Sequence, residues 1–227
     1  MHKLVPWLLF IVGLLIAGLA LADNIAPLDL AFQRIAGDSS ADQVSLSLRI
    51  TQVGDKSVLL EFKNLSPLES VVSEIYLQDL DRLIRGLTIQ NQESVGQVLF
   101  YGGAHPPELP GGQSYNFETT MAMEAKNPSP RWGIKPNETL KVLVELNSSA
   151  ALNSLITGLQ QQKFRVGLHV QSIGGKDSAS FVNLVPPPQD AVPEPATLAL
   201  AGSALLGSWV LRRRLEKRGR KSKQPQV

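Results

Sequence analysis

The alternation of apolar and polar residues over positions 44–53 constrains the fold of this chain more than any other feature. Within the stretch VSLSLRITQV the apolar members are Val44, Leu46, Leu48 and Ile50. A period of two places these side chains on the buried face of a strand and the intervening polar ones in water. The same alternation resumes after the turn dipeptide Gly54-Asp55, at Val58, Leu60 and Phe62. The two stretches together predict a β-hairpin.

Further strands are indicated by short apolar runs between Gly, Pro and Asn turns, at residues 73–78, 97–101, 113–121, 139–147, 164–171 and 179–184. Ser66-Pro67-Leu68-Glu69 is typical of a capping box and predicts a short helical turn. A second helix is predicted over 149–161, with an apolar stripe at Leu152, Leu155, Ile156 and Leu159. About seven or eight short strands predict a mainly β fold, an antiparallel β-sandwich of Ig-like or jelly-roll-like type, with one short amphipathic helix.

This β-rich stretch, residues 23–184, is long enough for one domain with a sizeable core. The chain contains no cysteine, so no disulfide supports the domain outside the cell. Burial of apolar surface must therefore stabilise it. The following residues 185–191, VPPPQDA, predict a stiff linker of polyproline type.

The amino-terminal residues 1–22 have the order of a secretory signal peptide. A short positive region with Lys3 precedes an apolar stretch, which ends at the small residues Ala20 and Ala22. We expect the Sec translocon to export the chain, and signal peptidase to cleave it so that Asp23 becomes the first residue. The alternative is an uncleaved membrane helix, because residues 4–21 approach the length of a bilayer span.

At the carboxyl end, residues 196–211 are uncharged and predict a short membrane helix. Sixteen residues rise about 24 Å as a helix, against a hydrocarbon core of about 30 Å. The basic residues Arg212, Arg213 and Arg214, and the basic tail 215–227, belong on the cytoplasmic side. Residues 23–191 carry 13 basic and 18 acidic side chains, and residues 192–227 carry 8 and 2. Because the basic residues follow a membrane segment, no nucleic-acid partner is expected.

The order of Pro-Glu-Pro, apolar helix and arginine cluster resembles the PEP-CTERM sorting signal of Gram-negative bacteria. The matching residues are Val192, Pro193, Glu194, Pro195, Leu198, Leu200, Gly202, Leu205, Gly207, Arg212, Arg213 and Arg214. The resemblance implies recognition by the membrane protease exosortase, cleavage near the Pro-Glu-Pro, and association with exopolysaccharide and biofilm. The signal would cover residues 192–214. Thirteen residues follow Arg214, a departure from the family pattern that bears on the efficiency of cleavage.

The exported body also resembles an uncharacterised group of PEP-CTERM proteins, which implies a shared fold and no known activity. The resemblance is carried by Ser66-Pro67-Leu68, by Leu109-Pro110-Gly111-Gly112, by GIKPNETL at residues 133–140 and by VGLHVQSIGG at residues 166–175.

Two physical features support these roles of the tail. The prolines at 193 and 195 hold the backbone extended and delay the start of a helix, so that a protease meets a strand-like substrate. Ala199, Ser203 and Gly207 recur every four residues and form a ridge of small side chains on which another helix can pack. The ridge is either a docking face for the protease or a consequence of the small-residue content that short membrane helices commonly have.

The exported body offers little recognisable chemistry. His169 is expected on a solvated polar strand face together with Arg165 and Gln171, and His105 in a loop. Asp79 and Asp81 form an Asp-x-Asp pair that suits calcium, although the rest of a calcium loop is missing. We therefore expect no catalytic residue, metal or cofactor, and a non-enzymatic surface or matrix protein. The alternatives are an exported hydrolase with two carboxylates facing one cleft, and a permanently anchored single-span surface protein.

Overall fold

The computed structural model of the protein describes residues 26–147 and 151–185. Its strands are β1 (Leu28–Gly37), β2 (Leu46–Gly54), β3 (Ser57–Asn64), β4 (Val71–Asp79), β5 (Ile84–Ile89), β6 (Phe100–Gly102), β7 (Met121–Ala125), β8 (Thr139–Leu146), β9 (Phe164–Ile173) and β10 (Asp177–Asn183). Its α-helices are α1 (Ser129–Trp132) and α2 (Ala151–Gln160), and its 3-10 turns are η1 (Ser39–Gln43), η2 (Asn91–Glu93) and η3 (Gly112–Tyr115).

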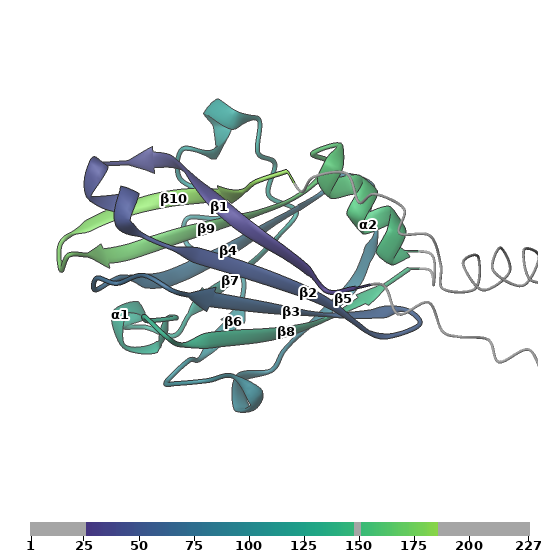
Figure 1. The fold of residues 1–227 in the computed structure, drawn as a ribbon, viewed down its shortest axis with the longest axis horizontal. Coiled ribbons are helices and arrows are strands. Elements are labelled where there is room, and N and C mark those ends of the chain that lie inside the picture. Colours follow the sequence, from purple (N-terminus) through teal and green to yellow (C-terminus); the bar gives the residue numbers. More distant parts are fainter. Residues whose placement is uncertain (1–25, 148–150, 186–227) are drawn as a thin grey trace, which may run out of the picture. The chain divides into compact units, whose positions relative to one another are not determined.

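The ten strands form one antiparallel sheet in the order β5-β8-β3-β2-β1-β10-β9-β4-β7-β6 (Figure 1). Strand β1 lies in the middle of this sheet and pairs with β2 on one side and with β10 on the other. Residues Leu28 to Ala31 pair with β2, whereas Phe32 to Gly37 pair with β10. We call the strands from β5 to β2 the first half of the sheet and the strands from β10 to β6 the second half.

The connection between β5 and β6 nearly closes the sheet into a barrel. Val95, in this connection, forms a β-bridge with Thr139 of β8. The side chain of Asn91 accepts a hydrogen bond from Phe100 N and donates one to Phe100 O, at 2.8 and 3.0 Å, and so holds β6. One segment, which follows edge strand β5 in the chain, is therefore bonded both to β8 and to the other edge strand, β6.

Apolar side chains from both halves form the main core. The first half contributes Leu48, Leu60, Phe62, Leu140 and Val142, and the second contributes Ile75, Leu77, Val166, Leu168 and Val170. The alternation predicted over residues 44–53 and 58–62 is confirmed, because Leu46, Leu48, Ile50, Val58, Leu60 and Phe62 are all buried. The predicted mainly β, antiparallel fold is thus confirmed.

Most of the predicted elements are observed close to their expected bounds. The hairpin of β2 and β3 is paired from Leu46↔Asn64 to Gly54↔Ser57, and β8, β9 and β10 lie where strands were expected. Helix α2 buries Leu155, Ile156 and Leu159 against the core. The predicted amphipathic stripe of this helix is confirmed for these three residues.

Two local predictions are wrong. Residues 113–121 do not form a strand: they contain η3, and Asn116 has a left-handed backbone with a φ of 49° that no regular strand allows. Residues 66–69 do not begin a helix. Instead Ser66 Oγ accepts a hydrogen bond from Ser45 N at 3.0 Å, which ties this connection to the start of β2.

A long loop, residues 103–120, covers the outer face of the second half; we call it the covering loop. Its Leu109 and Phe117 pack with Tyr76 of β4 and Val182 of β10 in a second, smaller apolar cluster. Gly167 of β9 permits this approach, because a Cβ at this position would lie 2.6 Å from Leu109 Cδ2. The second half of the sheet is therefore buried on both faces over much of its area.

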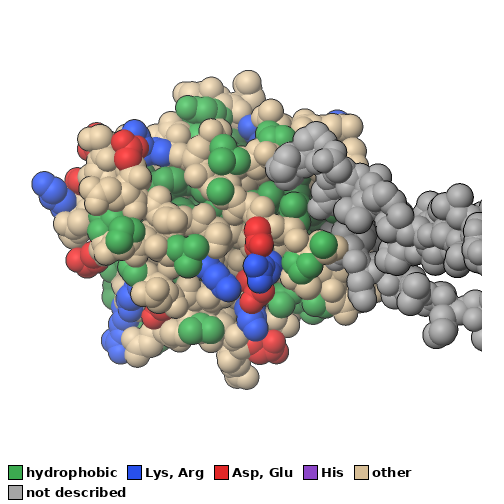
Figure 2. All heavy atoms as spheres, in the orientation of Figure 1, with side chains coloured by type: hydrophobic (Ala, Val, Ile, Leu, Met, Phe, Trp, Pro, Cys, Tyr) green, Lys and Arg blue, Asp and Glu red, His purple; other side chains and the backbone are tan. Residues whose placement is uncertain are grey.

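The outer face of the first half carries a row of alternating charges. The register places Asp29, Arg49, Glu61 and Lys141 side by side on β1, β2, β3 and β8. Figure 2 shows acidic and basic side chains alternating across this face. Arg49 binds Asp29 through two hydrogen bonds of 2.8 and 2.9 Å, and this contact lowers the pKa of Asp29. Opposite charges on neighbouring strands favour this register.

Within residues 26–147 and 151–185, no helix is long and apolar enough to cross a membrane. The predicted signal helix in residues 1–22 and the predicted membrane helix 196–211 lie outside the described residues, as do most of the linker and the basic tail.

Candidate functional site

The residues predicted to direct sorting all lie outside the part of the chain that the structure describes. They are the signal-peptidase residues Ala20 and Ala22, the motif Val192, Pro193, Glu194 and Pro195, the ridge Ala199, Ser203 and Gly207, and the basic flank Arg212, Arg213 and Arg214. Their roles stay predictions from the sequence.

The structure does show where the chain enters and leaves the body. Strand β10 ends at Asn183, which pairs with Phe32 of β1, and Leu184 N donates a 2.8 Å hydrogen bond to Ala31 O. Since β1 begins at Leu28, four residues before Phe32, its start lies about 13 Å along the strand direction from its pairing with the end of β10. Both ends of the described body therefore lie on one side of it (Figure 1).

Four polar side chains form a line across the outer face of the second half. The register pairs Glu124 of β7 with Glu74 of β4, Glu74 with His169 of β9, and His169 with Ser180 of β10. We call this set the polar row. Its members are far apart in the sequence and become neighbours only through the order of the strands.

Glu74 is the buried acid of the polar row. It is 5% exposed, and burial raises its pKa to about 7, with a further increase from the charge of Glu124. Ser73 Oγ donates a 2.6 Å hydrogen bond to Glu74 Oε2, and this bond lowers the pKa of Glu74 and so offsets part of the increase. Gln171 Nε2 donates to Glu74 Oε1 at 3.4 Å. This carboxyl group therefore holds a proton at mildly acidic pH.

The two histidines of the body occupy different environments. His169 Nδ1 lies 3.1 Å from Ser180 Oγ, and burial lowers the pKa of His169. His105, in the covering loop, is exposed, and its Nδ1 lies 3.3 Å from Glu124 Oε2. The prediction of a solvated face around His169 is wrong at Arg165, because the covering loop buries that neighbour to 8% exposure.

Serine, histidine and glutamate are the residue types of a hydrolytic triad, and the polar row brings them together. Ser180 is only 1% exposed and Glu74 only 5%, so neither reactive oxygen faces open solvent. An open hollow of about 300 Å³ lies beside His169, lined also by Gln171, Lys176 and Asp177 of the β9–β10 hairpin. As the body is folded here, a substrate in this hollow would meet His169 before the buried Ser180 or Glu74.

Asp79 and Asp81 serve separate purposes. Asp79 closes the β4–β5 turn, because its carboxylate accepts hydrogen bonds from Leu83 N at 3.0 Å and Ile84 N at 2.8 Å. Asp81 lies 3.4 Å from Lys163 Nζ. Among the described residues, no group of three or more His, Asp or Glu side chains is placed to hold a metal ion.

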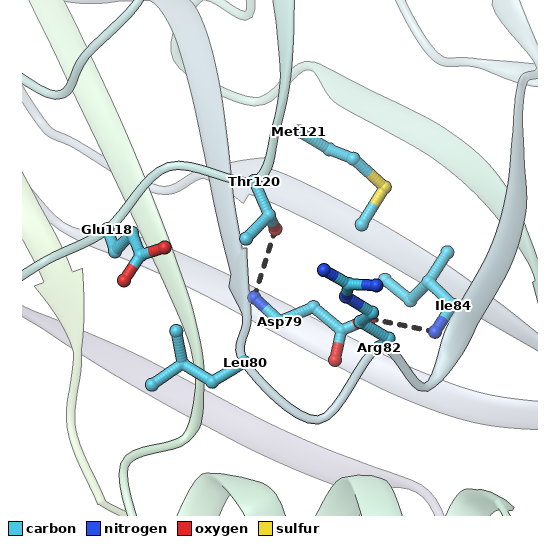
Figure 3. Close-up of a pocket in the computed structure, with 7 residues that line it drawn as sticks. All are labelled: Asp79, Leu80, Arg82, Ile84, Glu118, Thr120 and Met121. Carbon is cyan, nitrogen blue, oxygen red and sulfur yellow. Dashed lines mark hydrogen bonds between the residues drawn. The ribbon is translucent and has the colours of Figure 1, made fainter.

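A hollow of about 490 Å³ opens beside this turn (Figure 3). Asp79, Arg82 and Ile84 line one part of it, and Glu118, Thr120 and Met121 line another. Thr120 Oγ1 accepts a 3.0 Å hydrogen bond from Asp79 N, which joins the covering loop to the turn. Since the Asp79 carboxylate is already engaged by two backbone N–H groups, the hollow presents no free pair of carboxylates.

The fold and these sites define a mainly β body from which a carboxyl-terminal extension departs beside the first strand. Within that extension, residues 191–214 match the PEP-CTERM protein-sorting motif. The match covers the Pro-Glu-Pro, the apolar segment and the arginine cluster, so the predicted sorting signal is confirmed. It supports an exported protein that is anchored transiently in the membrane and processed by exosortase. No curated protein matches the chain.

Proposed function

We propose that this is a non-enzymatic surface or extracellular-matrix protein of a Gram-negative bacterium, associated with exopolysaccharide or biofilm. The observation that carries the proposal is the PEP-CTERM protein-sorting motif at residues 191–214. In this proposal the Sec translocon exports the chain, signal peptidase cleaves after Ala22, and the apolar segment 196–211 anchors the body. Exosortase then cuts near Pro193-Glu194-Pro195.

Features of the body support a role that needs no reaction. Glu74 and Ser180 of the polar row are buried, and the outer face of the first half presents alternating charges. We also propose that the body is a β-sandwich of Ig-like or jelly-roll-like type, since a single core is shared by the two halves of its sheet. The start of β1 and the end of β10 lie on one side of the body.

The carboxyl terminus of the mature protein in its native host tests the proposal. We expect mass spectrometry to find a terminus near Pro193 to Pro195. Replacing Pro193 and Pro195 by alanine should leave uncut protein in the membrane fraction, because the extended substrate is lost. Replacing Pro187 and Pro188 in the same way is the matched control, with cleavage unchanged. Intact Val227 throughout the mature pool would instead show a permanently anchored protein.

One observation favours a second candidate, an exported hydrolase acting on matrix glycans. Glu74 and Glu124 are directly opposed on β4 and β7, and Glu74 has the raised pKa of about 7 that a general acid requires. Glycan hydrolysis that is lost in both Glu74→Gln and Glu124→Gln, and kept in Glu118→Gln, would establish this activity and displace the first proposal.

A further inference from the structure

A pocket of about 440 Å³ lies where the chain leaves the body. Its wall includes Leu184 and Val185, directly after β10, together with Leu159 of α2 and Val182 of β10. Polar side chains complete it, namely Gln33, Tyr115, Gln162, Asn183 and Arg165. Its volume falls in the range of small-molecule sites and far exceeds what a single ion requires.

Arg165 is the one charged side chain among the described residues that line this pocket. It is 8% exposed and lies over the ring of Phe117, 5.2 Å from the ring centroid. Its Nη1 donates to Tyr115 O at 2.9 Å, and its Nη2 donates to Gln78 Oε1 at 2.7 Å and to Asn116 O. Three of the five guanidinium N–H groups are thereby bonded.

The guanidinium has no counter-ion in the described part of the chain. The ion pairs found there involve Arg34, Arg49, His105 and Lys163. Arg165 Nε is buried with no hydrogen-bond partner, and burial lowers the pKa of the side chain. A buried charge without a counter-ion is costly even when it is hydrogen-bonded, and an anion in the adjoining pocket would offset that cost.

The other residues that line the pocket indicate the kind of ligand to which the anionic group belongs. Gln33 and Gln162 offer amide groups that can bind hydroxyls, and the half-exposed ring of Tyr115 offers a flat apolar surface. A single guanidinium balances one negative charge, which suits a carboxylate better than a phosphate dianion. The set therefore matches a hydroxylated ring that bears one carboxylate.

We propose that this pocket binds a sugar acid of the uronic type, with its carboxylate paired to Arg165 and its hydroxyls facing Gln33 and Gln162. The claim that the ligand carries a carboxylate rests on Arg165 and its surroundings. The choice of a sugar as the carrier of the carboxylate rests on the proposed function. It deepens that proposal, because it names an acidic polysaccharide unit that a surface protein could recognise.

Calorimetric titration of the full chain in mild detergent tests the proposal, with sodium D-glucuronate, D-glucose and inorganic phosphate as probes at equal ionic strength. We expect glucuronate to bind at least about tenfold more tightly than either of the others. Equal affinity for glucose and glucuronate would refute carboxylate recognition. Phosphate that binds as tightly as glucuronate would reduce the pocket to a non-specific anion site and overturn the proposal.

Variants locate the binding. Arg165→Met should abolish glucuronate binding, but this change also removes bonds to the covering loop. Gln33→Ala and Tyr115→Ala change exposed side chains and should each weaken binding at least threefold with an unchanged melting temperature. Arg82→Gln, at the hollow in Figure 3, is the matched control and should bind as the wild type does. Unchanged affinity in both the Gln33 and Tyr115 variants would refute the site, whatever the fate of the Arg165 variant.

The chain's own tail is the competing occupant, since Asp190 follows Val185 by five residues. Glucuronate binding that is seen only in Asp190→Asn would show that the tail carboxylate fills the pocket and would overturn the proposal. Glucuronate binding in the wild type supports it. Failure of these titrations leaves the test of processing untouched, because that test measures the position of the carboxyl terminus.

Discussion

Replacing Glu74 by glutamine should stabilise the folded protein at neutral pH and leave its stability unchanged in acid. Glutamine has the shape of the protonated carboxyl group, and the surrounding hydrogen bonds can accommodate it. Its oxygen can accept from Gln171 Nε2, and its NH₂ group can donate to Ser73 Oγ. The Ser73 hydroxyl, which donates to Glu74 in the wild type, can then turn its hydrogen to His169 O, 3.2 Å away. The variant therefore removes a buried ionisable group without leaving a partner unsatisfied.

The size and sign of the effect follow from the pKa of Glu74. The pKa is about 7 in the folded protein and 4.5 ordinarily. Between these pH values the folded state binds more protons than the unfolded state, so the stability of the wild type falls as the pH rises and stays low above about pH 7. The full difference corresponds to about 3 kcal/mol. Because the neighbouring Glu124 side chain is partly open to solvent, we expect about 2 kcal/mol.

Urea denaturation followed by circular dichroism, near pH 5 and near pH 8, measures this effect as the difference between variant and wild type. His169 acts in the opposite direction, because its lowered pKa makes stability fall as the pH drops below its ordinary value of 6.5. Since both proteins contain His169, its contribution largely cancels in the difference. Glu118→Gln, an exposed acid of the covering loop, is the control and should show no pH-dependent gain.

Two results would refute this reasoning. A Glu74→Gln variant that is less stable than the wild type near pH 8 would mean that the carboxylate is ionised and well paired in the fold. An equal gain near pH 5 and near pH 8 would mean that the effect comes from packing and has no connection with the proton on Glu74.

Three further changes test other parts of the structure. Gly167→Ala places a Cβ against Leu109 and should cost about 1 to 3 kcal/mol while speeding proteolysis of the covering loop; unchanged proteolysis would contradict the packing described. Asp79→Ala leaves two turn N–H groups without acceptors and should cost about 1 to 3 kcal/mol in urea denaturation, against less than about 1 for Asp81→Ala; equal losses would contradict this assignment. Replacing Arg212, Arg213 and Arg214 by glutamine should weaken retention and orientation of the anchor in a protease-accessibility assay, and unchanged topology would count against the positive-inside argument.

The sequence predicted best those elements whose burial pattern is local. The hairpin of β2 and β3, strand β8 and helix α2 each have an apolar periodicity that can be read without knowing their neighbours. Strands β1 and β5 were not predicted. β1 changes partner at Phe32 and buries few side chains, and β5 is an edge strand with only half-buried apolar residues. Both strands are defined by hydrogen bonding to their neighbours in the sheet more than by an apolar periodicity in their own sequences.

The candidate sites also divide into one that is a local stretch of sequence and others that only the fold assembles. The sorting motif is a contiguous stretch read by other proteins as a linear signal, so Pro193, Glu194 and Pro195 could be recognised from the order of residues alone. Glu74 and His169 were present in the sequence as an unremarked acid and an isolated histidine. The sequence gives no sign that they become neighbours, because they lie 95 positions apart and the strand order decides which residues meet.

By itself, the sequence determined that this chain is mainly β and carries a sorting signal, since both properties are encoded in short, local patterns. Only the tertiary structure decided that Glu74 is buried with a raised pKa and that Arg165 lies beneath the covering loop. The physical reason is that burial and charge pairing depend on which surfaces come together. On this protein a loop of the second half covers a strand face that its own sequence marks as polar.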